Sequence, residues 1–192
     1  MTDLATPENE KQSLSGIEIA VARNRAFAEA GKHEGATLIP TLRLLVLTCL
    51  DPRVDPAHIL GLDLSDALVL RNNGGRVTAQ AINDVAYLSA LADLVRPEGP
   101  LFEIAVIQHT ECGAARLADD GFRVKYAERI GAEESDLRGY AVVDPAATVT
   151  TDIERLRTAP SISPRMTVSG HVYNVGTGLI ETIVSAQPVG AA

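Results

Sequence analysis

Short apolar runs alternate with segments of helical periodicity along most of this chain. The apolar runs lie at 42–48, 67–70 and 101–108, and their length and content are typical of strands that a sheet buries on both faces. Between and around these runs, apolar residues at helical spacing predict helices over 15–32 and 78–94. A candidate cap followed by proline predicts two more helices, over 56–60 and 145–157. The alternation of strands with helices predicts an α/β fold with a mostly parallel sheet.

The last part of the chain carries the pattern of a hairpin. Two segments suited to strands, 166–175 and 179–184, flank Gly-Thr-Gly at 176–178. The Gly-Thr-Gly segment is interpreted as a hairpin turn, because a phosphate-binding loop needs a strand-to-helix context and a lysine. We therefore expect a central, mostly parallel sheet of about four to five strands with flanking helices, an N-terminal helical arm and a C-terminal hairpin strand.

Several local signals refine the helices. Asp55, Thr78 and Asp144 each precede a helical segment and are candidate N-caps. The segments 113–120 and 122–130 are interpreted as helical pieces, and 133–139 as polar surface. The core-facing side of the 78–94 helix is expected to consist of Ala81, Val85, Leu88, Leu91 and Ala92.

The size of the chain favours one domain. With 192 residues, of which 46% are hydrophobic, the chain is large enough to bury a core. The polar segment 1–14 is expected to be a flexible N-terminal tail. We expect a single domain over 15–192 that includes the helical arm at 15–32.

Charge and hydropathy exclude several classes of partner. A net charge of −8 and a pI near 5.0 argue against binding to nucleic acid, which depends on clustered basic residues. No apolar stretch approaches the roughly 18 to 20 residues that cross a membrane. Because residues 1–8 also lack the features of a signal peptide, we expect a cytoplasmic protein with no membrane partner.

The candidate chemistry lies in two clusters, each placed where an apolar run ends. Cys49 follows the run at 42–48, while His109 and Cys112 follow the run at 101–108, and these are the only two cysteines of the chain. Ligands in α/β sheets bind beyond the carboxyl ends of the strands. Two thiolates and one imidazole make three ligands for Zn²⁺, and a catalytic zinc site leaves the fourth position open. A cysteine considered alone is more simply a small buried hydrophobe.

Asp51 and Arg53 stand two and four residues after Cys49. A carboxylate beside zinc accepts a hydrogen bond from a bound hydroxide, or it takes the fourth position and closes the site. Arg53 can hold the carboxylate away from the metal through a bidentate pair. Without a nearby metal, the two residues would be an ordinary surface ion pair.

In this order and at these intervals, the motifs resemble the β-class carbonic anhydrase family, of the short bacterial type. The resemblance extends from about residue 42 to 184. The residues that carry it are Cys-x-Asp-x-Arg at 49–53, Arg-Asn-Asn-Gly at 71–74, His-x-x-Cys-Gly at 109–113, Gly-His-Val-Tyr at 170–173 and Thr-Gly at 177–178.

The resemblance implies a zinc enzyme that hydrates carbon dioxide reversibly to bicarbonate and a proton through a zinc-bound hydroxide. Cys49, His109 and Cys112 would be the metal ligands, and Asp51 and Arg53 the catalytic pair. It also implies a homodimer or a higher homo-oligomer, in which the helical arm at 15–32 lies over the partner.

Three features depart from the pattern of the family. Pro52 stands where the family usually has a small residue, and we expect it to stiffen the segment from Asp51 to Arg53. Asn73 replaces the usual alanine of the glycine loop. The glutamine that many members place before the first strand has no counterpart in 37–41.

Two alternatives remain open. The same site could hydrolyse carbon disulfide or carbonyl sulfide, which are linear molecules open to the same attack. A non-catalytic zinc-bearing scaffold would instead have Asp51 close the metal permanently, with Pro52 locking it shut. His33, His58 and His171 receive no site role, because their surroundings predict a solvated or hydrogen-bonded imidazole.

Overall fold

The computed structural model describes residues 15–190. By its internal contacts the chain divides into one unit up to Ala36 and a second unit from Thr37 onward. The flexible tail predicted over 1–14 lies outside the described residues. The single domain predicted over 15–192 stays a prediction.

The first unit contains helix α1, Gly16–Glu29. Ser15 and Glu18 form a capping box, in which the Ser15 hydroxyl accepts a hydrogen bond from the Glu18 N–H and the Glu18 carboxylate accepts one from the Ser15 N–H. The sequence predicted that this helix would extend to Lys32, but it ends at Glu29. None of its side chains is buried, so the capping box is the main local support that the described contacts give it.

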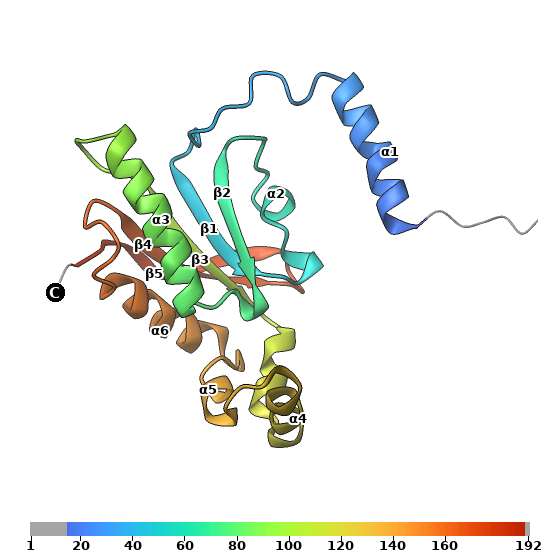
Figure 1. Cartoon of the computed structure of the whole chain (residues 1–192), viewed down its shortest axis with the longest axis vertical. Helices are drawn as coiled ribbons and strands as arrows, with labels where there is room; N and C mark the ends of the chain where they lie inside the picture. The colour runs from blue at the N-terminus through green and yellow to red at the C-terminus, as the bar shows by residue number, and fades with distance from the viewer. Residues whose placement is uncertain (1–14, 191–192) are drawn as a thin grey trace, which may run out of the picture. The chain divides into compact units, whose positions relative to one another are not determined.

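The second unit is built on one sheet of five strands in the order β2-β1-β3-β4-β5 (Figure 1). The first four strands of this order run parallel, and β5 pairs antiparallel with β4 through the hairpin turn at 176–178. This arrangement confirms the predicted fold class. The strands are β1 (Leu44–Cys49), β2 (Ala67–Asn72), β3 (Glu103–His109), β4 (Thr167–Asn174) and β5 (Leu179–Pro188).

Helices cover the sheet and fill its connections. The main core lies between one face of the sheet and two helices, and it includes Leu47 and Val106 from the strands and Val85 and Ile153 from the helices. The helices of this unit are α2 (Pro56–Ile59), α3 (Ala79–Val95), α4 (Asp120–Ile130), α5 (Glu134–Arg138) and α6 (Pro145–Arg157), with short 3-10 turns at Pro52–Val54, Asn73–Gly75 and Gly113–Ala118.

The predicted N-caps are confirmed. The side chains of Asp55, Thr78 and Asp144 each accept a hydrogen bond from a backbone N–H in the first turn of α2, α3 and α6. Pro56 and Pro145 follow two of these caps at the first helical positions, where a missing N–H costs nothing.

The polar surface predicted over 133–139 has no buried residue, and residues 134–138 of it form the short helix α5. One local expectation is wrong. On α3, Leu91 is 42% exposed, whereas Ser89 is buried in its place. Ser89 can be buried because its hydroxyl accepts a hydrogen bond of 2.9 Å from the N–H of Ser163, in the loop before β4.

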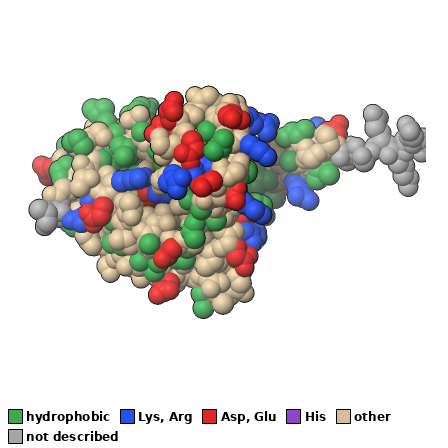
Figure 2. All heavy atoms as spheres, turned by 90° about the horizontal axis from the view of Figure 1, so that it is seen from below, with side chains coloured by type: hydrophobic (Ala, Val, Ile, Leu, Met, Phe, Trp, Pro, Cys, Tyr) green, Lys and Arg blue, Asp and Glu red, His purple; other side chains and the backbone are tan. Residues whose placement is uncertain are grey.

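The outer surface carries both signs of charge. Figure 2 shows acidic and basic side chains intermixed with apolar ones over the face that it draws. Over the described part of the chain, none of the helices has both the length and the apolar character needed to cross a membrane.

The parallel arrangement brings the carboxyl ends of β1, β2 and β3 to one edge of the sheet. Beyond β2, Gly74 and Gly75 have positive φ angles of +77° and +61°, a conformation that L-residues rarely adopt. A Cβ atom on Gly75 would lie 2.9 Å from the backbone nitrogen of Cys49. Glycine is therefore required here both by conformation and by close approach to β1.

We predict that Gly75→Ala destabilises the protein more than Gly61→Ala does. Gly61 has a nearly equal φ of +63° but nothing within 4 Å of the added Cβ. Gly61→Ala should therefore lower the free energy of unfolding by only about 1–2 kcal/mol, the cost of the left-handed conformation. Gly75→Ala adds overpacking against backbone, for a total of about 3 kcal/mol or more. Urea unfolding of both variants tests this, and equal losses would contradict it.

Candidate metal centre

Three side chains that the sequence singled out lie together at the edge where β1 and β3 end. Cys49 is the last residue of β1 and His109 the last of β3, and Cys112 begins the 3-10 turn that follows. All three are buried, and their ligand atoms all lie within 4.8 Å of one another. The two sulfur atoms are 3.9 Å apart. The site is thus assembled from two neighbouring strands and the turn after the second.

The hydrogen bonding of His109 leaves one ring nitrogen available. Nδ1 lies 2.9 Å from the carbonyl oxygen of Thr110, so a proton on Nδ1 is donated there and Nε2 keeps its lone pair. Nε2 is buried and has no hydrogen-bond partner among the described residues. An orphaned nitrogen of this kind is costly unless something binds it. Its position beside two thiols fits a metal ion with sulfur and nitrogen ligands, and the backbone partner of Nδ1 fixes the ring as in known metal sites.

The thiols and the imidazole influence one another's ionisation. The Cys112 thiol, together with His109 and the backbone N–H groups of Asp51 and Gly74, lowers the pKa of Cys49 to about 4. The Cys49 thiolate in turn raises the pKa of Cys112 above its ordinary value. Burial would lower the pKa of His109, but the Cys49 sulfur outweighs burial and raises it. The two thiols thus favour the loss of one proton over the loss of two, whereas a bound metal favours deprotonation of both.

Asp51 and Arg53 form a close pair beside this cluster. Arg53 Nε donates to Asp51 Oδ1 over 3.0 Å and Nη2 donates to Oδ2 over 2.8 Å, while the Arg53 backbone N–H also donates to Oδ1 over 2.9 Å. These hydrogen bonds from Arg53 lower the pKa of the Asp51 carboxyl to about 2. The carboxylate is therefore charged at neutral pH and is oriented by one guanidinium.

Pro52 is compatible with this pair. It occupies the beginning of the 3-10 turn Pro52–Val54, and Asp51 is the N-cap of that turn. Proline suits the first position of a helical turn because its N–H would have no partner there. The residue that departs from the pattern of the family thus helps to place Asp51 as a cap whose oxygen faces the Arg53 N–H.

The structure adds two residues to which the sequence analysis gave no role. Arg71 spans the turn after β1, because Nε donates to the Cys49 carbonyl over 2.9 Å and Nη2 to the Asp51 carbonyl over 2.7 Å. Glu111 accepts a hydrogen bond of 3.2 Å from Arg53 Nη1. The Arg-Asn-Asn-Gly motif was a usable signal for Arg71, whereas a contact between residues 53 and 111 has no signature in one sequence.

The other two histidines of the second unit lie outside the cluster. His171 is in β4, with Nε2 2.9 Å from the Ser169 hydroxyl and Nδ1 3.1 Å from the Thr182 hydroxyl. His58 is exposed on α2. Neither belongs to the group of metal-ligating side chains found among the described residues.

Comparisons with known proteins agree with this geometry. The family model described as carbonic anhydrase matches residues 44–141. The β-carbonic anhydrase 1 of Mycobacterium bovis is 25% identical over 144 residues, which cover 75% of this chain and 83% of the relative. A carbon disulfide hydrolase of Acidianus sp. is 31% identical over 159 residues, which cover 70% of this chain and 74% of that protein.

A solved structure extends the agreement to the fold. The crystal structure of a carbonic anhydrase from Streptococcus mutans is 29% identical, with a TM-score of 0.74, and the match covers 90% of this chain and 99% of that one. The match of the family model includes Cys49, His109 and Cys112, the three residues of the metal-binding cluster. The chain belongs to the β-class carbonic anhydrase family.

Proposed function

We propose that this protein binds zinc through Cys49, His109 and Cys112 and catalyses the reversible hydration of carbon dioxide to bicarbonate and a proton. The observation that carries the proposal is the buried Nε2 of His109, which has no partner among the described residues and stands beside two thiols. When bound by three such ligands, zinc supplies a Lewis acid that activates a water molecule near neutral pH.

The proposed role of Asp51 is to orient the nucleophile. Its Oδ2 accepts a hydrogen bond of 2.8 Å from Arg53 Nη2 and a longer one of 3.3 Å from Arg53 Nε. Nε is shared with Oδ1, to which it is closer at 3.0 Å, so Oδ2 can accept a further donor. Arg53 holds the carboxylate in one orientation through three hydrogen bonds from its side chain and one from its backbone N–H. Asp51 would thus accept a hydrogen bond from the attacking oxygen and align it with the carbon of the substrate.

An open site is favoured over a non-catalytic scaffold. In a scaffold, an Asp51 oxygen would lie among the metal-ligating atoms. The cluster of mutually close ligand atoms instead consists of Cys49, His109 and Cys112, while the Asp51 oxygens are bonded to Arg53. This pairing supports a fourth position that is available to water or substrate.

A second substrate class has specific support. The carbon disulfide hydrolase relative suggests that the same site could attack carbon disulfide or carbonyl sulfide, whose central carbon is also electrophilic. We place carbon dioxide first because the match to the Streptococcus mutans carbonic anhydrase covers nearly all of both chains. The substrates in either case are small neutral molecules with a linear geometry.

Self-association is part of the proposal. Helix α1 presents Ile17 and Val21 to solvent, 70% and 44% exposed, and buries none of its side chains. An apolar helix face of this kind is suited to a second copy of the chain. We infer a homodimer or a higher homo-oligomer, and a cytoplasmic location stays a prediction from the sequence.

We predict both the zinc content of the protein and its preference among three substrates. The purified protein should contain about one zinc per chain and hydrate carbon dioxide faster than it hydrolyses carbonyl sulfide or carbon disulfide, in stopped-flow and headspace assays. His109→Asn should lose both the zinc and the activity, because it removes the imidazole ligand. His58→Asn, an exposed histidine on α2, is the matched control and should retain both.

Two outcomes would refute this prediction. Carbon dioxide hydration at the parental rate by zinc-free His109→Asn would exclude the metal mechanism. Faster turnover of carbon disulfide than of carbon dioxide by the parent would assign the second substrate class instead.

A further prediction tests the Asp51–Arg53 pair. Arg53→Ala should reduce carbon dioxide hydration at pH 7 by about 10- to 100-fold, because the freed carboxylate competes for the open position. The loss should be smaller at pH 9, since hydroxide competes better with the carboxylate as pH rises. The pH profile of kcat/KM for both proteins provides the measurement. A loss that is equal at pH 7 and pH 9 would contradict the proposed role of Arg53.

A further inference from the structure

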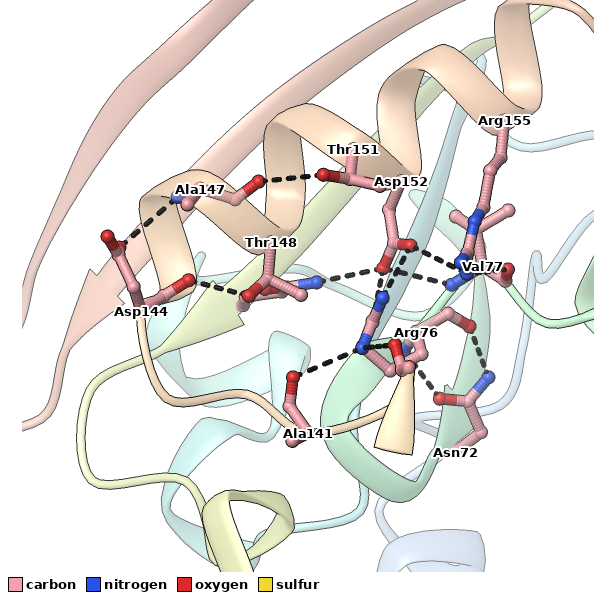
Figure 3. Close-up of polar contacts among 12 residues, drawn as sticks. Asn72, Arg76, Val77, Ala141, Asp144, Ala147, Thr148, Thr151, Asp152 and Arg155 are labelled. Carbon is pink, nitrogen blue, oxygen red and sulfur yellow. Dashed lines mark hydrogen bonds and ion pairs between the residues drawn. The ribbon is translucent and has the colours of Figure 1, made fainter. Parts of the chain in front are cut away.

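Asp152, a buried residue of α6, is hydrogen-bonded both to the turn beside Cys49 and to the residue before His109. Asp152 of α6 is 0% exposed. Its carboxylate accepts hydrogen bonds from Arg76 Nε over 2.6 Å, from Arg76 Nη2 over 3.0 Å and from the Val77 backbone N–H over 3.2 Å (Figure 3). It also accepts one of 3.0 Å from Gln108 Nε2. A fifth hydrogen bond, of 3.3 Å, comes from Arg155 Nη1 on α6 itself. Five donors on three segments thus converge on one side chain.

The first set of contacts leads to Cys49. Arg76 follows the Gly74–Gly75 turn directly, and its backbone N–H and carbonyl both bond to the Asn72 side chain over 2.8 Å (Figure 3). The turn is therefore closed by Asn72 and anchored by Asp152. Gly74 donates its N–H to the Cys49 sulfur, and Gly75 lies against the Cys49 backbone. A shift of Arg76 would move both glycines relative to Cys49.

The second contact leads to His109. Gln108 immediately precedes His109 in β3, and successive side chains of a strand point to opposite faces. His109 therefore faces the metal cluster while Gln108 faces α6. Gln108 is 0% exposed, and its amide nitrogen bonds to Asp152. Its carbonyl oxygen has no hydrogen-bond partner among the described residues, so the contact with Asp152 is the polar attachment that the structure shows for this side chain.

The stability of the fold does not by itself explain why the Asp152–Arg76 ion pair is buried. Both Asp152 and Arg76 are almost completely buried, and removing an ion pair from water costs much of what the pairing returns. Apolar side chains of the same volume would often stabilise a fold equally well. Such a pair does, however, enforce one geometry, because a bidentate contact has a fixed direction and length.

We propose that Asp152 is a positioning residue of the metal centre, which sets the placement of Cys49 relative to His109 by holding Arg76 and Gln108 at once. The inference rests on the proposed zinc function. Asp152 touches neither metal nor substrate, and it acts through the turn beside Cys49 and through the residue before His109. Zinc held by ligands that are fixed in advance should dissociate more slowly than zinc held by ligands that are free to separate.

The test is zinc release from the loaded protein into an excess of a chromogenic chelator. Asp152→Asn keeps the shape of the side chain but replaces one acceptor oxygen with a donor that faces the Arg76 guanidinium. We expect it to release zinc about 10- to 100-fold faster than the parent. Ile153→Val, a buried neighbour on α6 that loosens the core without touching Asp152, is the matched control and should release zinc at the parental rate.

A second variant covers the case in which Asp152→Asn does not fold. Gln108→Leu removes only the contact to β3, leaves the Arg76 pair intact and should release zinc several-fold faster than Ile153→Val. If Gln108→Leu and any folded Asp152→Asn release zinc as slowly as Ile153→Val, Asp152 is structural and the inference is wrong. A parent that retains no zinc would overturn the proposed metal centre itself, and this inference with it.

Discussion

The parallel pairing of β1 with β3 is the constraint on which the site depends. Cys49 and His109 are sixty residues apart in sequence, and no local turn could bring them together. The pairing does so because Thr48 is aligned with Ile107, which places the ends of both strands at one edge. A register shift of one residue would turn the end of a strand to the opposite face and separate the ligands. His109 and Cys112 come from one local motif, whereas the meeting of Cys49 with them is a consequence of register.

Hydrogen bonds from Arg71 and Arg53 fix the segments around the cluster of Cys49, His109 and Cys112. Arg71 bonds to the carbonyl groups of Cys49 and Asp51, so the turn after β1 follows one course. Arg53 orients the Asp51 carboxylate and reaches Glu111 beside Cys112. These contacts use two arginines whose planar guanidinium groups make several directed hydrogen bonds at once.

The sequence predicted the elements whose signals are local and periodic. Both long helices of the second unit, the strand ends at Cys49 and His109 and the N-caps Thr78 and Asp144 follow from spacing and from residue type. The short helix α5 was not predicted, because five mostly polar residues show no hydrophobic periodicity. The role of Asp152 was not predicted, because it depends on contacts between segments distant in sequence. Arg71 stands in a motif that the sequence shows, but its contacts with the turn after β1 have no local signature. The candidate ligands themselves were predictable, since both cysteines stand where an apolar run ends.

We propose that folding of one sheet edge assembles a zinc site from two thiolates and one imidazole. X-ray absorption at the zinc K edge of the purified protein tests this proposal, because it reports the type and distance of the atoms around the metal. We expect two sulfur atoms at about 2.3 Å and a nitrogen at about 2.0–2.1 Å, with a lighter atom in the fourth position. A first shell of nitrogen and oxygen alone, with no sulfur, would contradict it.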